Sequence, residues 1–169
     1  MHDNPRQGLQ LAYLAGLMDG EGTIRIDKVK SKKALKIMNK RSPNYSAHLS
    51  LGSVDEIIPK MFHVQFGGSL RVECVSGKRP MFRWYIRGNR NALQALKMLL
   101  PYLVIKKRNA LEVIRFIEEW KTPYSMKAGV DFQELQRREE AYQKLRKLNA
   151  VGLAATTEWR NTREGEATV

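Results

Sequence analysis

Hydrophobic and polar residues along this chain follow two periods, which together predict a mixed α+β fold. Helical spacing of apolar residues covers five ranges: 8–19, 55–66, 89–100, 106–120 and 131–149. Alternation of apolar and polar residues covers four: 23–30, 45–52, 69–75 and 81–88. The resulting order α-β-β-α-β-β-α, followed by extra helices, predicts an antiparallel sheet with helices on one face.

Two segments lack a clear period. Residues 31–43 are rich in Lys and Arg and admit either a short helix or an extension of a strand. Residues after Val151 are polar and weakly patterned, so we expect a mobile or peripheral tail there. We therefore divide the chain into a domain over residues 1–152 and a polar C-terminal tail over residues 153–169.

The alternation places apolar residues on one face of the sheet and polar, mostly basic residues on the other. The inward set is Ile24, Ile26, Ala47, Leu49, Leu51, Leu70, Val72, Cys74, Phe82, Trp84 and Ile86. The outward set is Arg25, Asp27, Ser46, His48, Ser50, Arg71, Glu73, Arg83, Tyr85 and Arg87. Four arginines against two acids differ from an ordinary solvated sheet face, which mixes both signs. This favours a surface that lies along DNA, where β-ribbons reach base edges in the major groove.

The charge of the whole chain points to the same partner. The formal net charge is +13 and the isoelectric point is about 10.0, which favours binding to a polyanion. No apolar run approaches the ~18 residues of a membrane span, so we expect no membrane partner. The N-terminal residues lack the apolar centre of a signal peptide. A single cysteine, Cys74, excludes an internal disulfide, and we therefore expect an intracellular location.

A nine-residue run joins the first helix to the first strand: Leu14-Ala-Gly-Leu-Met-Asp-Gly-Glu-Gly22. The helix before it is apolar around most of its surface, so it must be buried in the core or against a partner. Ala15 and Gly16 would let a second backbone approach closely, and Gly20 and Gly22 flank Glu21 where backbone freedom is needed. A lone Asp-Gly-Glu-Gly is usually a surface turn, but the length of the run favours a functional motif.

This run resembles the LAGLIDADG motif of homing endonucleases, with an identical or common variant residue at every position. The resemblance covers about residues 9–120, strongly at the motif and weakly elsewhere. By matched position it implies that Glu21 is the metal-binding catalytic carboxylate and that the Gly20 carbonyl is a further metal ligand. It also implies that Asp19, like Ala15 and Gly16, is structural, and that Asp19 caps the partner helix.

Phosphodiester cleavage needs a nucleophilic hydroxide and a stabilised leaving oxygen, which divalent ions on hard oxygen ligands supply. We expect Mg²⁺ as the cofactor. One carboxylate beside one carbonyl is too little to hold such ions, whereas two copies meeting at a symmetry axis would suffice. The motif occurs once in the sequence, so the resemblance implies a homodimer.

A second feature of the family is a lysine near the start of the helix that follows the last strand pair. Pro101-Tyr-Leu-Val-Ile-Lys-Lys-Arg-Asn-Ala110 resembles that segment and puts Lys106 at the catalytic position. A basic helix end that touches DNA backbone or solvent is an equally good interpretation. One departure stands out: the family's outer Gln and basic residue would fall at Gly52 and Glu56, so Lys60 or His63 would have to supply the charge, or that outer shell differs.

The predicted sheet and the basic loop set the length of the target. The range 25–41 contains eight Lys or Arg and one acid, and we expect Lys32, Lys33 and Arg41 to contact phosphates. An eight-residue strand spans about 26 Å. Two strands related by a dyad span about 52 Å, or roughly 16 base pairs, and the loops extend this to about 20. A partly palindromic double-stranded target of that length is expected.

The sequence therefore predicts an intron-encoded, site-specific DNA endonuclease that makes a metal-dependent double-strand cut as a homodimer. Two alternatives stay open on the same fold: a maturase that binds its intron RNA, and an inactive DNA-binding regulator. His48 is either a DNA contact on the sheet face or a satisfied structural histidine. The three histidines are too scattered for a zinc site, and no phosphate-binding P-loop occurs.

Overall fold

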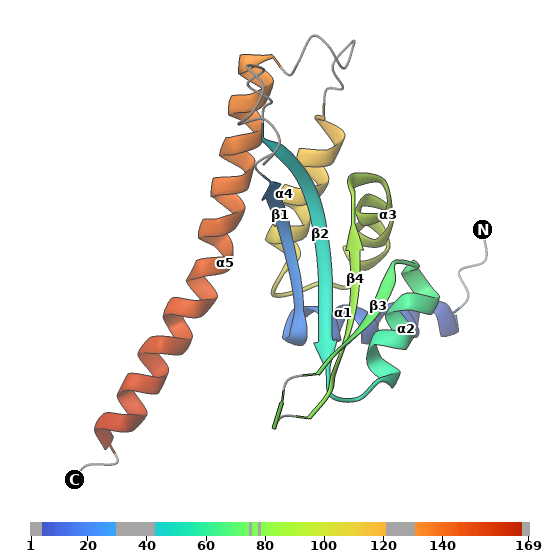
Figure 1. The fold of residues 1–169 in the computed structure, drawn as a ribbon, viewed down its shortest axis with the longest axis vertical. Helices are drawn as coiled ribbons and strands as arrows, with labels where there is room; N and C mark the ends of the chain where they lie inside the picture. The colour runs from blue at the N-terminus through green and yellow to red at the C-terminus, as the bar shows by residue number, and fades with distance from the viewer. Residues whose placement is uncertain (1–4, 30–42, 75, 78, 121–130, 167–169) are drawn as a thin grey trace.

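The computed structural model describes residues 5–29, 43–74, 76–77, 79–120 and 131–166, with side-chain surroundings described as far as Ala150. Five helices and one four-stranded sheet lie in this part of the chain (Figure 1). In chain order they are α1 Pro5–Glu21, β1 Gly22–Val29, β2 Asn44–Ser53, α2 Ile57–Phe66, β3 Ser69–Glu73, β4 Met81–Arg87, α3 Asn89–Leu99, α4 Lys107–Glu118 and α5 Phe132–Glu166. The predicted α+β class is confirmed. The expected short helix or strand extension in the basic loop lies outside the described residues.

The strands pair antiparallel throughout, in the order β1-β2-β4-β3. The register puts Arg25 opposite His48 and His48 opposite Arg87, so these three side chains form one row across the sheet. Because the side-chain period of a strand is two, this register sends every predicted outward residue to the same face. The helices α3 and α4 cover the other face (Figure 1).

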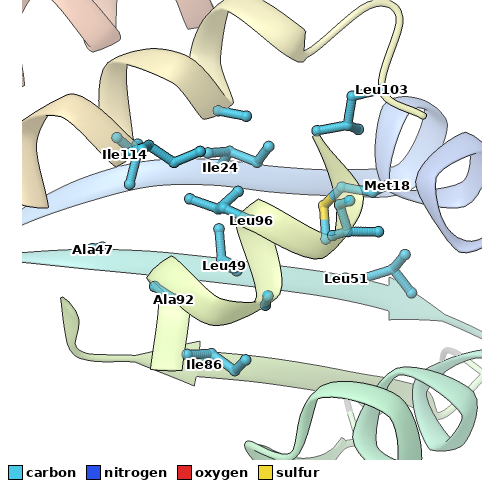
Figure 2. Close-up of a cluster of buried hydrophobic side chains, with 14 of the residues drawn as sticks. Met18, Ile24, Ala47, Leu49, Leu51, Ile86, Ala92, Leu96, Leu103 and Ile114 are labelled. Carbon is cyan, nitrogen blue, oxygen red and sulfur yellow. The ribbon is translucent and has the colours of Figure 1, made fainter. Parts of the chain in front are cut away.

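The core fills the space between the sheet and its helices (Figure 2). Fully buried residues come from α1, α3 and the strands β1, β2 and β4, among them Met18, Leu49 and Leu96. Trp84 of β4 is also fully buried, and its indole N–H donates to the Gly67 carbonyl at 2.7 Å. The apolar residues of the edge strand β3 are different, since Leu70 and Val72 remain 43% and 54% exposed.

The helix α1 runs directly into β1, and it is longer than the sequence pattern predicts. Gly20 lies inside the helix, and neither Gly20 nor Gly22 has a positive φ, so the expectation of unusual backbone freedom was wrong. Gly22 is required for a different reason. A Cβ there would overlap the Met18 sulfur and lie 2.6 Å from the Met18 carbonyl oxygen. The sharp passage from helix to strand is therefore possible only with a hydrogen at this position.

The last helix, α5, also differs from its prediction, because it continues past residue 149 to Glu166. It lies along the β1 side of the sheet, and its C-terminal half diverges from the sheet (Figure 1). Lys28 and Tyr45 both bind Glu139 of α5, the lysine at 2.6 Å. The expected division between residues 152 and 153 falls within this helix and stays a prediction. No helix in the described ranges combines the length and the hydropathy of a membrane-spanning segment.

Candidate active site and nucleic-acid interface

The motif helix α1 has one buried face and one exposed face. Leu11, Leu14, Ala15 and Met18 point into the core of the chain. The opposite face is a stripe of residues at helical spacing that we call the α1 stripe: Leu9, Ala12, Tyr13, Gly16 and Gly20. Its large members, Leu9 and Tyr13, are 73% and 54% exposed. Ala15 was expected to receive a second backbone, but it is fully buried in its own core, and Ala12 occupies the exposed position instead.

The carboxylate of Asp19 is buried and binds three consecutive backbone amides of its own chain. The N–H groups of Val104 and Ile105 donate to one oxygen at 2.7 and 3.1 Å, and that of Lys106 donates to the other at 2.7 Å. Successive amides in such a turn form an anion-binding nest. Asp19 therefore fixes the turn that leads into α4. The expected cap on a partner helix stays a prediction.

The side chain of Lys106 in turn binds the end of α1. Its ammonium group donates to the Met18 carbonyl at 3.0 Å and also to the Asp19 carbonyl. These are two of the carbonyls that a helix end leaves without a partner, and a cation is favourable there. Burial lowers the pKa of Lys106, while the negative charges of Asp19 and Glu21 oppose that shift. Asp19 and Lys106 thus lock the end of α1 to the start of α4.

The contacts of Asp19 and Lys106, which we call the Asp19–Lys106 lock, leave the last two residues of α1 facing solvent. Gly20 and Glu21 are both exposed, and the Gly20 carbonyl has no helical partner because the chain enters β1. A carboxylate and a carbonyl are the hard oxygen ligands that Mg²⁺ prefers, so their chemistry fits such an ion. Within the described residues, no group of three or more acidic, His or Cys side chains could hold a metal.

The open face of the sheet carries a shallow hollow lined by eight of the predicted contact residues. They are Arg25, His48, Ser50, Arg71, Glu73, Arg83, Tyr85 and Arg87. Asp27 lies beside it and accepts a hydrogen bond from Arg25 at 2.8 Å. The predicted contacts Lys32, Lys33 and Arg41 lie outside the described residues. Four arginines against Asp27 and Glu73 leave this face with an excess of two positive charges.

His48 is on this face but is only 4% exposed. Its Nδ1 lies 2.8 Å from Asp27 Oδ2 and 3.3 Å from Arg25 Nη2, so with the proton on Nδ1 it donates to Asp27. Burial lowers the pKa of His48, opposed by the hydrogen bond to Asp27, and this favours the neutral ring. Burial raises the pKa of Asp27, but the hydrogen bond from His48 and the charge of Arg25 outweigh it and lower the pKa.

The two outer positions stay unassigned. Gly52 has Met81 and Arg83 as its side-chain neighbours, and Glu56 pairs with Lys60 at 2.8 Å on α2. His63 is exposed on the same helix. The α1 stripe and the nest around Asp19 are the features that sequence reasoning missed. A sequence pattern could have predicted the stripe, since its small residues recur at helical spacing. No sequence pattern predicts the nest.

These features define a basic, four-stranded saddle joined to a helix that ends in an exposed acid. No family model and no curated protein matches the sequence. Solved structures do match, with the homing endonuclease I-CvuI among them, bound to the I-CreI target with Mg and the DNA uncleaved. It is 23% identical, with 86% of this chain and 85% of that chain covered and a TM-score of 0.68.

Two further matches extend the comparison. The archaeal intron-encoded homing endonuclease I-Vdi141I, complexed with DNA, is 12% identical over 84% of this chain and 85% of that chain, with a TM-score of 0.64. The LAGLIDADG homing endonuclease I-SmaMI, bound to cleaved DNA, is 20% identical over 80% of this chain but only 42% of that chain, with a TM-score of 0.54. This chain therefore has the LAGLIDADG homing-endonuclease fold, as its nine-residue run predicted.

Proposed function

We propose that this protein is a site-specific, intron-encoded homing endonuclease that cuts both strands of DNA as a homodimer. One observation carries the proposal: α1 presents an exposed apolar stripe that leads directly to the exposed Gly20 and Glu21, beside a basic sheet face. A surface turn with no function would explain neither the stripe nor its position. The solved structures with the same fold are described as homing endonucleases bound to DNA, which supports this assignment.

The α1 stripe supports self-association. Small residues at Ala12, Gly16 and Gly20 allow two helix backbones to approach closely, and Leu9 supplies apolar area to bury. Val104 and Ile105, whose amides bind Asp19 near the end of α1, are 82% and 74% exposed and would add apolar area to bury. A twofold axis along paired α1 helices brings like ends together, so the two Glu21 side chains would lie at one site.

The pairing completes the chemistry that one chain lacks. Bound Mg²⁺ would supply the hydroxide nucleophile and stabilise the leaving oxygen. Glu21 and the Gly20 carbonyl would hold the ion, twice over in the dimer. The lock between Asp19 and Lys106 fixes the helix end that carries both groups, and the sheet face holds the DNA. That I-SmaMI matches this chain over only 42% of its own length fits a chain that contains the unit twice.

Gly16→Asp tests the dimer, because a side chain at Gly16 meets nothing within 4 Å in the chain itself. Sedimentation should give twice the 19.5 kDa chain mass for the wild type and a single chain mass for Gly16→Asp, with loss of double-strand cutting. Gln10→Asp is the matched control, since it adds the same charge to an exposed position of α1 outside the stripe. A Gly16→Asp dimer, or a wild-type monomer that cuts both strands, would contradict the proposal.

Glu21→Gln tests the metal ligand. Because Glu21 is exposed and holds no side chain in the part of the chain that the structure describes, the variant should fold and bind target DNA in Ca²⁺ as the wild type does. Cutting in Mg²⁺ should fall by several orders of magnitude. Unchanged cutting would remove Glu21 from the mechanism.

A further inference from the structure

The four arginines of the sheet face fall into two classes. Arg25 and Arg83 are each held by a carboxylate of the same face. Arg25 Nε donates to Asp27 at 2.8 Å, and Arg83 donates to Glu73 through Nε at 3.0 Å and Nη2 at 3.1 Å. Arg71 has no acidic partner among the described residues, and neither does Arg87, which lies over the Tyr85 ring at 5.4 Å.

A carboxylate partner changes what an arginine can recognise. It cancels most of the arginine's charge, which weakens attraction to phosphate, and it repels a phosphate that comes close. It also fixes the guanidinium, so less conformational entropy is lost when a base binds. An arginine without such a partner keeps its full charge and is suited to the DNA backbone. The two classes therefore differ in ligand.

The geometry of Arg83 shows which base it suits. A guanidinium has five N–H groups, and Glu73 takes one from Nε and one from Nη2. The Nη1 group has no partner among the described residues, and Nη2 otherwise faces only the weak acceptor Met81 Sδ at 3.6 Å. The end of the fork is thus available for two parallel hydrogen bonds. In the major groove, guanine O6 and N7 are the acceptor pair for such a fork.

Arg25 is held in the same way. Asp27 accepts from Arg25 with one oxygen and from the buried His48 with the other, so the carboxylate cannot swing away. The Nη groups of Arg25 remain on the open face, and among the described residues their one contact is that of 3.3 Å to His48. Arg25 lies in the same row across the sheet as Arg87 of β4, and Arg83 lies four residues before Arg87 on that strand. At ~3.3 Å per residue this is about 13 Å, or about four base pairs.

We infer that Arg25 and Arg83 each read one guanine in a half-site, about four base pairs apart. Asp27 and Glu73 are positioning residues that hold these two arginines and keep them from phosphates. Arg71 and Arg87 contact the DNA backbone. The inference rests on the proposed function, since it needs the sheet face to lie in the major groove.

Arg83→Ala and Arg71→Ala form a matched pair, because the two residues lie directly opposite each other on β4 and β3. Each variant and the wild type select bound duplexes from a randomised library in Ca²⁺, where binding is measured without cutting. Arg83→Ala should lose one guanine preference per half-site, and because the dimer loses two such contacts, binding to the wild-type consensus should weaken about 25- to 20,000-fold. Arg71→Ala should keep the consensus, bind all sequences more weakly, and lower the salt slope by about two, one for each subunit.

Glu73→Gln separates positioning from plain structure. Removing the negative charge should strengthen binding to non-specific DNA while it weakens the same guanine preference, a combination that partial unfolding cannot produce. Asp27→Asn should do the same at the other guanine. An unchanged consensus in Arg83→Ala, or a guanine preference lost in Arg71→Ala, would overturn this inference but not the proposed function. A wild-type protein that selects no duplex would overturn the proposed function, and this inference with it.

Discussion

Replacing Asp19 tests the lock that holds the catalytic end of α1. Asp19→Ala removes the acceptor of three amide hydrogen bonds, from Val104, Ile105 and Lys106. Asp19→Asn is milder. The asparagine side chain keeps one oxygen, which can accept at most from the two backbone amides that share Oδ2. Its N–H₂ group then faces the third backbone N–H, with which it cannot form a hydrogen bond.

The magnitude follows from those contacts. A hydrogen bond to a charged group contributes about 1.5–3 kcal/mol, but water reaches the exposed turn once the carboxylate is gone and recovers much of this. We expect Asp19→Ala to lower the free energy of unfolding by about 3 kcal/mol and Asp19→Asn by about 1.5 kcal/mol. For a domain of this size, 3 kcal/mol lowers the melting temperature by roughly 6–12 °C.

Urea unfolding followed by tryptophan fluorescence measures the loss, because Trp84 is fully buried in the native core. The titration is repeated at several protein concentrations, since self-association would add to the apparent stability. Glu21→Gln is the control: it removes one acid two residues away from an exposed position and should change stability by less than about 0.5 kcal/mol. Equal midpoints for Asp19→Ala and wild type, or an equal loss in Glu21→Gln, would refute the lock.

Three further predictions concern the close contact at Gly22, the charge of Glu134 and the divalent metal ion. Gly22→Ala should destabilise the fold by about 1–3 kcal/mol in a thermal melt, because its Cβ meets the Met18 backbone, whereas Gly52→Ala meets only flexible side-chain ends and should be nearly neutral. An equal effect of the two would contradict this reasoning. Burial raises the pKa of Glu134, but hydrogen bonds from Arg137 and Arg138 outweigh it and lower the pKa to about 2, from 4.5. Its contribution, on the order of 3 kcal/mol, is present above about pH 4.5 and lost as the pH falls toward about 2. The stability difference between wild type and Glu134→Gln should shrink over that range, and a constant difference would exclude this account. Chelation of divalent ions should stop DNA cutting but leave DNA binding, as a gel-shift and cleavage assay would show; cutting in the chelator would remove the metal from the mechanism.

The sheet was predictable because its information is local. Alternation at a period of two decides which face each strand residue occupies, and Ile24 and Leu49 are buried on the expected side while Arg25 lies on the other. The nine-residue run was sufficient to predict the fold because its information is also local. It concentrates the helix, the passage into β1 and the exposed acid in one short stretch.

Other features depend on contacts that no local pattern encodes. The nest around Asp19 comes from residues 104–106, at separations of 85 to 87 positions. The exposed face of α1 was misjudged because small and apolar residues occur on both sides of that helix, so Ala12 and Ala15 could not be distinguished. The α5 helix was extended too little, because the residues after 149 lack the apolar spacing on which the helix prediction relied.

Cutting of a randomised duplex library by the wild-type protein, with Mg²⁺ in one arm and Ca²⁺ in the other, tests the central claim most directly. Sequencing recovers both the cut ends and the bound, uncut DNA. The account predicts cut ends in Mg²⁺ only, on both strands, within a partly palindromic consensus of about 20 base pairs. Bound DNA without cut ends in either arm, or ends on one strand of an asymmetric site, would contradict a homodimeric endonuclease.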